Sequence, residues 1–201
     1  MQKGWATIVS TGTHSAAKTR NLILMGIFAA LIAVGAYIRI PLPFSPVPIT
    51  LQFIFSVYAG LFLGSRRGFC SVMVYILVGL SGIPVFTNGG GIGYVVMPTF
   101  GFLLGFAFCA LWVGYGRSRM KEYRFLPLFG VILGGLVILY SIGWLYLYWA
   151  LAIYGGKAVT LGQAFMLGVA PFIVNDMVFS AIAALTAIKV LPTLKKLGYL
   201  D

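Results

Sequence analysis

The chain has 201 residues, of which 61% are hydrophobic and only 8% are charged, and its formal net charge is +11. Soluble domains carry roughly 25% charged residues, so this composition excludes a soluble protein and predicts an integral membrane protein. Nucleic acid is not expected as a partner, because the basic residues stand at the ends of apolar runs and not in one patch. No polar stretch is long enough for a second domain.

Six apolar runs follow a polar N-terminal stretch, residues 1–21, which we interpret as a cytoplasmic tail. The runs cover, in order, residues 22–38, 49–63, 69–83, 98–115, 126–154 and 164–188. We therefore expect an all-α membrane protein in which residues 22–201 form one domain of six transmembrane helices. The first run could also be the core of a signal peptide, but it ends without a small-residue cleavage pattern and is kept as a span.

The basic residues indicate the orientation of this bundle. Six spans place both termini on one side of the membrane, and twelve of the fourteen lysines and arginines then lie on that side. Only Arg39 and Lys157 lie opposite. Because cytoplasmic segments carry the excess of Lys and Arg, both termini are expected in the cytoplasm, and the protein is expected to be multi-pass in the lipid of the cytoplasmic membrane.

The last apolar run contains Asp176, one of only three acidic residues. If residues 164–188 form one helix, Asp176 lies near the middle of the bilayer, where a charged side chain costs ~2.5–3.5 kcal/mol and needs a partner, water or a ligand. Pro171 is expected to kink this helix, and Asn175 and Asp176 are then expected to line a pocket. The alternative is an acid that neighbouring helices satisfy or that stays protonated.

Three outward loops of unusual composition are expected above this polar pair. Residues 41–48 include four prolines, which exclude a helix and favour an extended strap. Residues 84–97 are rich in glycine but lack the Gly-Lys-Ser/Thr of a phosphate-binding loop. The third loop precedes the last span and contains Lys157. Together they suggest a lidded small-molecule site in which Arg39 or Lys157 attracts an anionic ligand, unless both side chains snorkel to lipid headgroups.

Other motifs point to packing. Gly101 and Gly105 are four residues apart and predict a smooth face for close contact between helices. Cys70 and Cys109 lie in apolar runs and are expected in the core, not in a disulfide or metal site. The fifth run ends in an aromatic cluster, interpreted first as a belt at the membrane interface and second as a stacking wall for a ligand: Tyr140, Trp144, Tyr146, Tyr148 and Trp149.

Enzyme functions find no support in the sequence. It has no H-E-x-x-H motif, no second intramembrane acid and no Walker A motif, and its single histidine, His14, is far from the spans. We therefore expect no enzymatic activity, no cofactor and no metal. Binding or transport of a small molecule remains, because a channel would need more polar groups along its path.

Three segments resemble the BioY family, the biotin-binding S components of energy-coupling-factor transporters. They are Ile40-Pro-Leu-Pro-Phe-Ser-Pro-Val-Pro-Ile-Thr-Leu-Gln52, Gly79-Leu-Ser-Gly-Ile-Pro-Val-Phe86 and Pro98-Thr-Phe-Gly-Phe-Leu-Leu-Gly-Phe106. The resemblance spans residues 22–190 and implies a six-helix S-component fold that captures biotin from outside. It also implies partners, namely a transmembrane coupling subunit and ATPase subunits. In the family an Ala-xxx-Ala face of the first helix docks the coupling subunit, and it maps to Ala29 and Ala33.

The resemblance implies a set of binding residues as well. The family's site acid falls on Asp176 and its loop asparagine on Asn88, and both are expected to accept hydrogen bonds from the ureido N–H groups of biotin. The family's lysine, three residues after the acid, is replaced by Phe179. The biotin carboxylate therefore needs another anchor, for which we expect Arg39.

The apolar part of biotin is expected to lie against Phe86, Tyr94 and Phe100, and Gln52 and Asn175 complete the expected site. Two alternatives from other classes stay open. One is a proton-coupled carrier for a small anion, in which the intramembrane acid is the protonation site and no ATPase takes part. The other is a structural subunit in which this acid only locks the packing.

Overall fold

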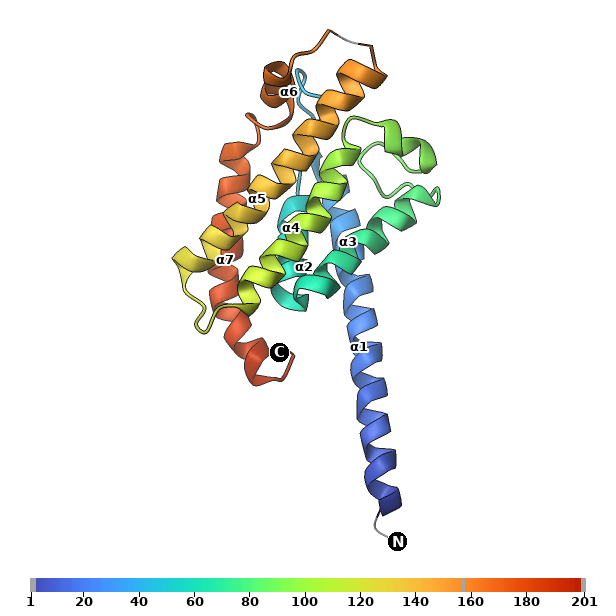
Figure 1. Ribbon diagram of the computed structural model, residues 1–201, viewed down its shortest axis with the longest axis vertical. Coiled ribbons are helices and arrows are strands. Elements are labelled where there is room, and N and C mark those ends of the chain that lie inside the picture. Colours follow the sequence, from blue (N-terminus) through green and yellow to red (C-terminus); the bar gives the residue numbers. More distant parts are fainter. Residues whose placement is uncertain (1–2, 157, 200–201) are drawn as a thin grey trace.

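The computed structural model describes residues 3–156 and 158–199, which form a bundle of helices (Figure 1). These residues contain seven α-helices: α1 (Lys3–Tyr37), α2 (Gln52–Leu63), α3 (Ser65–Leu80), α4 (Phe100–Ser118), α5 (Phe125–Tyr148), α6 (Leu161–Gly168) and α7 (Ile173–Lys196). A 3₁₀ helix (Ile92–Val96) precedes α4, and a π-helical turn (Trp149–Tyr154) continues α5. Helix α1 begins and helix α7 ends at the same end of the bundle (Figure 1).

Four helical segments of the described chain are long and apolar enough to cross a membrane: Lys18–Tyr37, Phe100–Ser118, Phe125–Ala152 and Ile173–Lys196. The expectation of a helical membrane protein is confirmed, with four segments of sufficient length in the described chain. Helices α2 and α3, with 12 and 16 residues, are shorter than the ~20 residues that cross a bilayer. Helix α2 is enclosed by protein, because it packs against α1, α3, α4 and α7.

Helix α4 lies at the centre of the bundle, against α2, α3 and α5. Of its most apolar segment 67% is buried, against 22% for α1 and 28% for α5 and α7, so the outer helices carry the more exposed apolar surface. The expected close contact at Gly105 is confirmed, because a Cβ atom there would lie 2.8 Å from the carbonyl oxygen of Leu139 on α5. Cys109 on α4 is buried as expected, whereas Cys70 is exposed on α3, so the core prediction is wrong for Cys70.

The two ends of the helical domain differ from the prediction. Helix α1 begins at Lys3 and not at Leu22, because residues 3–21 contain no proline to interrupt it. The last apolar run is not one kinked helix: α6 ends at Gly168 and α7 begins at Ile173. Pro171 lies in the break, where its ring and missing N–H are incompatible with helix continuation. Asp176 therefore lies in the first turn of α7, and not midway along a helix.

The proline-rich segment forms the loop of a short hairpin, and not an extended strap. Strand β1 (Arg39–Ile40) pairs antiparallel with β2 (Ile49–Thr50), so residues 41–48 turn back on themselves. The Ser45 hydroxyl donates a hydrogen bond of 2.6 Å to the carbonyl oxygen of Leu167, which attaches the hairpin to α6. Figure 1 shows the hairpin beside α6, at the end of the bundle opposite to the start of α1.

Candidate functional site

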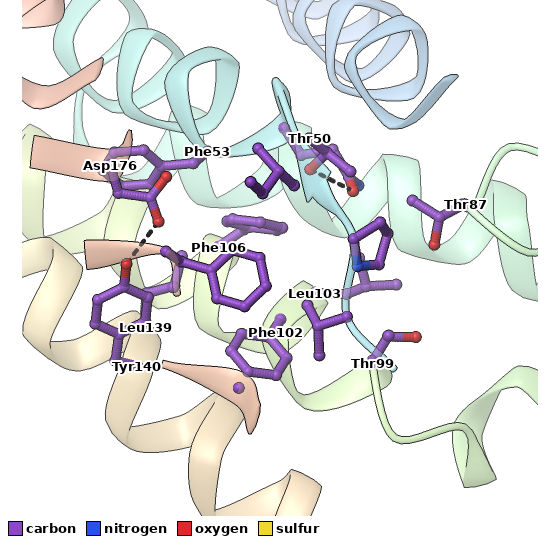
Figure 2. A pocket seen from close by; sticks show the side chains of 16 residues that line it. Thr50, Phe53, Thr87, Thr99, Phe102, Leu103, Phe106, Leu139, Tyr140 and Asp176 are labelled. Carbon is purple, nitrogen blue, oxygen red and sulfur yellow. Dashed lines mark hydrogen bonds between the residues drawn. The ribbon is translucent and has the colours of Figure 1, made fainter. Parts of the chain in front are cut away.

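A pocket lies below the hairpin, between α2, α4, α5 and the start of α7 (Figure 2). It contains about 50 Å³ of free space, enough for a few water molecules at ~10–15 Å³ each. Most of its lining is apolar, with a few polar groups, as is usual for small-molecule sites. The lining residues are Val47, Pro48, Ile49, Thr50, Gln52, Phe53, Thr87, Thr99, Phe102, Leu103, Phe106, Leu139, Tyr140, Gly168, Phe172 and Asp176.

Asp176 is the acidic group of this pocket and is only 7% exposed. Its Oδ2 accepts a hydrogen bond of 2.7 Å from the Tyr140 hydroxyl, and its Oδ1 accepts a long one of 3.4 Å from the Asn175 amide. The first turn of a helix favours a negative charge, because the helix dipole points its positive end there. Within the described part of the chain no Lys or Arg forms an ion pair with Asp176, so Oδ1 keeps acceptor capacity for a ligand.

The polar groups of the pocket lie on two sides of an apolar slot. Figure 2 shows Asp176 and Tyr140 on one side and three threonines on the other, with the side chains of Phe102, Leu103 and Phe106 between them. The threonines are Thr50, Thr87 and Thr99. A ligand that fits this slot has a hydrogen-bond donor at one end, an apolar middle and a polar group at the other end.

Gln52 is buried on the threonine side and is held by two hydrogen bonds. Its Oε1 accepts a bond of 3.3 Å from the Thr50 hydroxyl, and its Nε2 donates one of 2.8 Å to the Tyr75 hydroxyl. The Tyr75 hydroxyl donates in turn to the carbonyl oxygen of Val85, at 3.2 Å. This chain of bonds connects β2, α2 and α3 to residues 84–97.

The three expected aromatic residues lie behind the pocket wall and not in it. The Tyr94 hydroxyl forms a hydrogen bond of 2.9 Å with Thr87 Oγ1 and accepts one of 3.1 Å from Thr99 Oγ1. Its ring lies 4.4 Å from that of Phe86, and both residues are at most 3% exposed. Phe100 is also buried, and its ring lies 5.9 Å from that of Tyr146. Tyr94 thus orients two of the threonines that line the slot.

Arg39 and Asn88 lie at the border of the pocket, and both are exposed. Arg39 Nη1 donates hydrogen bonds to the carbonyl oxygen of Thr87 and, at 3.0 Å, to Asn88 Oδ1. The amide oxygen of Asn88 is therefore engaged by Arg39 and does not line the slot. Of the two cations predicted to face outward, Arg39 joins the hairpin to residues 84–97, while Lys157 lies outside the described residues.

Several pocket residues are absent from the sequence prediction. Tyr140 belongs to the predicted aromatic belt, but its hydroxyl is bonded to Asp176. Trp144, another member of that cluster, donates from its Nε1 to the carbonyl oxygen of Leu161 at 2.9 Å. Phe102 and Phe106 are four residues apart on α4 and therefore share one face, which is a signal that the sequence does contain.

The expected docking face of α1 is only partly accessible. Ala29 is 7% exposed and belongs to the core of the bundle, and Ala33 packs against that core. Gly26 and Ala30, which are also four residues apart, lie on the exposed side of the helix. Gly26 and Ala30 are therefore more accessible to a partner than Ala29 and Ala33.

Comparisons with known proteins agree on one family. A model described as the BioY family matches residues 9–196. A probable biotin transporter BioY from Lysinibacillus sphaericus is 44% identical over 169 residues, which cover 84% of this chain and 85% of that protein. A probable biotin transporter BioY from Pyrococcus horikoshii is 39% identical over 171 residues, which cover 85% and 95%.

A solved structure shows that the fold is shared as well. The crystal structure of the S-component for biotin from an ECF-type ABC transporter superposes with a TM-score of 0.77 and 23% sequence identity. The match covers 87% of this chain and 92% of that chain. Sequence and fold lead to the same conclusion: this chain belongs to the BioY family.

Proposed function

We propose that this protein captures biotin for uptake across the cytoplasmic membrane, as the substrate-binding S component of an energy-coupling-factor transporter. The observation that carries the proposal is the position of Asp176, a buried carboxylate at one end of an apolar slot whose other end is polar. Relatives described as biotin transporters align over 84% of the chain or more, which makes biotin the ligand to test. Family membership also makes this a transport protein and not an enzyme.

The pocket suggests how biotin lies in it. The ureido ring points to Asp176, because its N–H groups are donors and Asp176 Oδ1 retains acceptor capacity. The thiophane ring and the valeryl chain lie along Phe102, Leu103 and Phe106. The carboxylate then reaches the side of Thr87, whose hydroxyl accepts from Tyr94 and donates its own hydrogen to the carboxylate.

Arg39 supplies the positive charge for that carboxylate. One of its nitrogens uses both of its hydrogens on the loop at Thr87 and Asn88, and the guanidinium has three further N–H donors to offer. Arg39 thereby takes the role of the family's lysine, whose position is occupied by Phe179 in this chain. Asn88 accordingly positions Arg39, and is not an acceptor for the ureido ring.

The same proposal includes the topology. Helices α1 to α5 and α7 are the six spans, with both termini in the cytoplasm, because twelve of the fourteen basic residues belong to that side. The short helix α2 is compatible with this topology, because the hairpin before it can lie at membrane depth. Irregular backbone is tolerated there where protein encloses it. A coupling subunit docks on the exposed side of α1, at Gly26 and Ala30, where small residues permit close helix contact.

Calorimetry on the purified protein in detergent tests the binding function. We expect Asp176→Asn to weaken biotin binding about 5- to 150-fold, because a lost partner for a buried polar group costs ~1–3 kcal/mol. Glu122→Gln is the matched control, because Glu122 is exposed and paired with Arg124. Biotin binding that is equal in all three proteins would show that Asp176 is not the ureido acceptor. Failure of the parent to bind biotin would reject the proposed function itself.

A further inference from the structure

Two adjoining pockets lie at the basic end of the bundle, away from the biotin site. The first, which we call the arginine pocket, measures about 270 Å³ and contains Arg66, Arg67 and Arg117 in its lining. The second, the apolar groove, measures about 260 Å³ and is lined mainly by aliphatic and aromatic side chains of α1, α2 and α7. The two share Leu63, Arg67 and Tyr199, so they adjoin.

Arg117 is the main evidence for a ligand in the arginine pocket. It is only 5% exposed, and its Nε and Nη1 are buried without a hydrogen-bond partner in the described structure. A guanidinium is always charged, and a buried charge without a counter-charge is destabilising. An anion in the arginine pocket, which Arg117 lines, would supply the missing counter-charge.

The start of α3 strengthens the preference for an anion. Arg66 and Arg67 lie in its first turn, where the helix dipole already adds positive potential, and no side chain caps the helix there. Among the residues that the structure describes, no acidic one lines either pocket. Of the described acids, Glu122 is paired with Arg124, and Asp176 lies in the biotin site.

We infer that these two pockets form one binding site for an anionic phospholipid. The phosphate group lies in the arginine pocket against Arg117 and the start of α3, and an acyl chain lies in the apolar groove along Leu24, Phe28 and Leu194. Basic pockets between transmembrane helices are suited to anionic headgroups. A free phosphate ion would use only the arginine pocket, so the adjoining groove favours a lipid.

Native mass spectrometry of the detergent-purified protein tests this site. Phosphatidylglycerol and phosphatidylcholine with the same acyl chains are titrated separately, and the affinity for the first bound lipid is measured. We expect phosphatidylglycerol to bind about tenfold more tightly, and Arg117→Gln to remove this preference, because charge-assisted hydrogen bonds are lost. Arg119→Gln is the matched control, since Arg119 is exposed at the same end but lines neither pocket, and its preference should equal that of the parent.

Two further variants keep the test decisive if Arg117→Gln does not fold. Arg66→Gln, at the exposed rim, should reduce the preference severalfold, and Leu194→Trp, which fills the groove, should weaken phosphatidylglycerol binding. An unchanged preference in Arg66→Gln would overturn the proposal. Displacement of phosphatidylglycerol by millimolar inorganic phosphate, with no effect of Leu194→Trp, would mean a free-anion site and would also overturn it.

The chain's own last residue provides the final comparison. Asp201 carries a carboxylate two positions after Tyr199, which lines both pockets. If the parent shows no lipid preference and Asp201→Asn gains one, the chain itself supplies the anion, and the lipid proposal is wrong. Equal preference in the parent and in Asp201→Asn supports the lipid site.

Discussion

Tyr140 and Asp176 are 36 residues apart in sequence, yet the Tyr140 hydroxyl donates a hydrogen bond of 2.7 Å to Asp176 Oδ2. The bond joins α5 to the first turn of α7 and fixes the direction of the carboxylate at the pocket wall. With Oδ2 engaged by the protein, Oδ1 is the oxygen left for a ligand. In the proposed binding mode the two oxygens of this carboxylate therefore have different tasks, Oδ2 in holding the fold and Oδ1 in binding the ligand.

Removal of this bond should destabilise the protein. We expect Tyr140→Phe to lower the free energy of unfolding by ~1–3 kcal/mol, because a buried acceptor loses its partner. Thermal melting in detergent measures the effect. Tyr148→Phe is the control, since Tyr148 lies on the same helix and the structure describes no hydrogen bond of its hydroxyl. Equal melting temperatures for the two variants would contradict the prediction.

The role of Arg39 can be separated from that of the loop it contacts. We expect Arg39→Ala to weaken biotin binding more than biotinamide binding, because only biotin carries the charge that the guanidinium neutralises. Calorimetry with both ligands gives the two ratios, and Asn88→Ala serves for comparison because it removes one hydrogen bond to the guanidinium and keeps the positive charge. If Arg39→Ala weakens both ligands by the same factor, Arg39 acts only by holding residues 84–97.

The contact between α4 and α5 should depend on the missing side chain of Gly105. Gly105→Ala places a methyl group 2.8 Å from the Leu139 carbonyl oxygen, and we expect a loss of ~1–3 kcal/mol in unfolding free energy. Gly130→Ala on α5 is the control, because a Cβ atom there meets nothing within 4 Å. It should be neutral or stabilise by up to ~1 kcal/mol, since Ala favours helix. Similar losses in both variants would exclude the steric explanation.

Tyr75 should act together with Gln52. It is 1% exposed and accepts from the Gln52 amide while it donates to the Val85 carbonyl oxygen. We expect Tyr75→Phe and Gln52→Leu each to lower the melting temperature, and the double variant to lose less than the sum, because both remove the same bond. Strict additivity in this double-mutant cycle would show that the bond contributes nothing to stability.

The parts of the fold set by local sequence were predictable. The apolar runs placed the long helices, and Asp176 stood out because an acid in such a run requires compensation. Pro171 marked a perturbation of the last helix, but a proline alone does not distinguish a kink from a complete break. The hairpin was missed for a similar reason, since four prolines exclude a helix without fixing which strands pair.

Most of the pocket could not be predicted, because its residues meet only through tertiary packing. No sequence motif marks Thr87 and Thr99 as pocket residues. Both are held at one wall of the pocket by hydrogen bonds to the Tyr94 hydroxyl. Tyr94 and Phe86 were expected to touch the ligand, yet they lie behind that wall. An aromatic residue near a site is equally suited to either place, and only the packing of residues 84–97 decides between them.

The small free space of the pocket has a kinetic consequence. Biotin is far larger than the few water molecules that fit, so the proposed binding mode includes an opening of the slot before or during association. If opening comes first, the observed binding rate levels off at high biotin concentration, at the rate of opening. The measured affinity is then the intrinsic affinity multiplied by the fraction of open molecules. Substitutions that loosen the hairpin, far from any atom of biotin, would accelerate capture and release together.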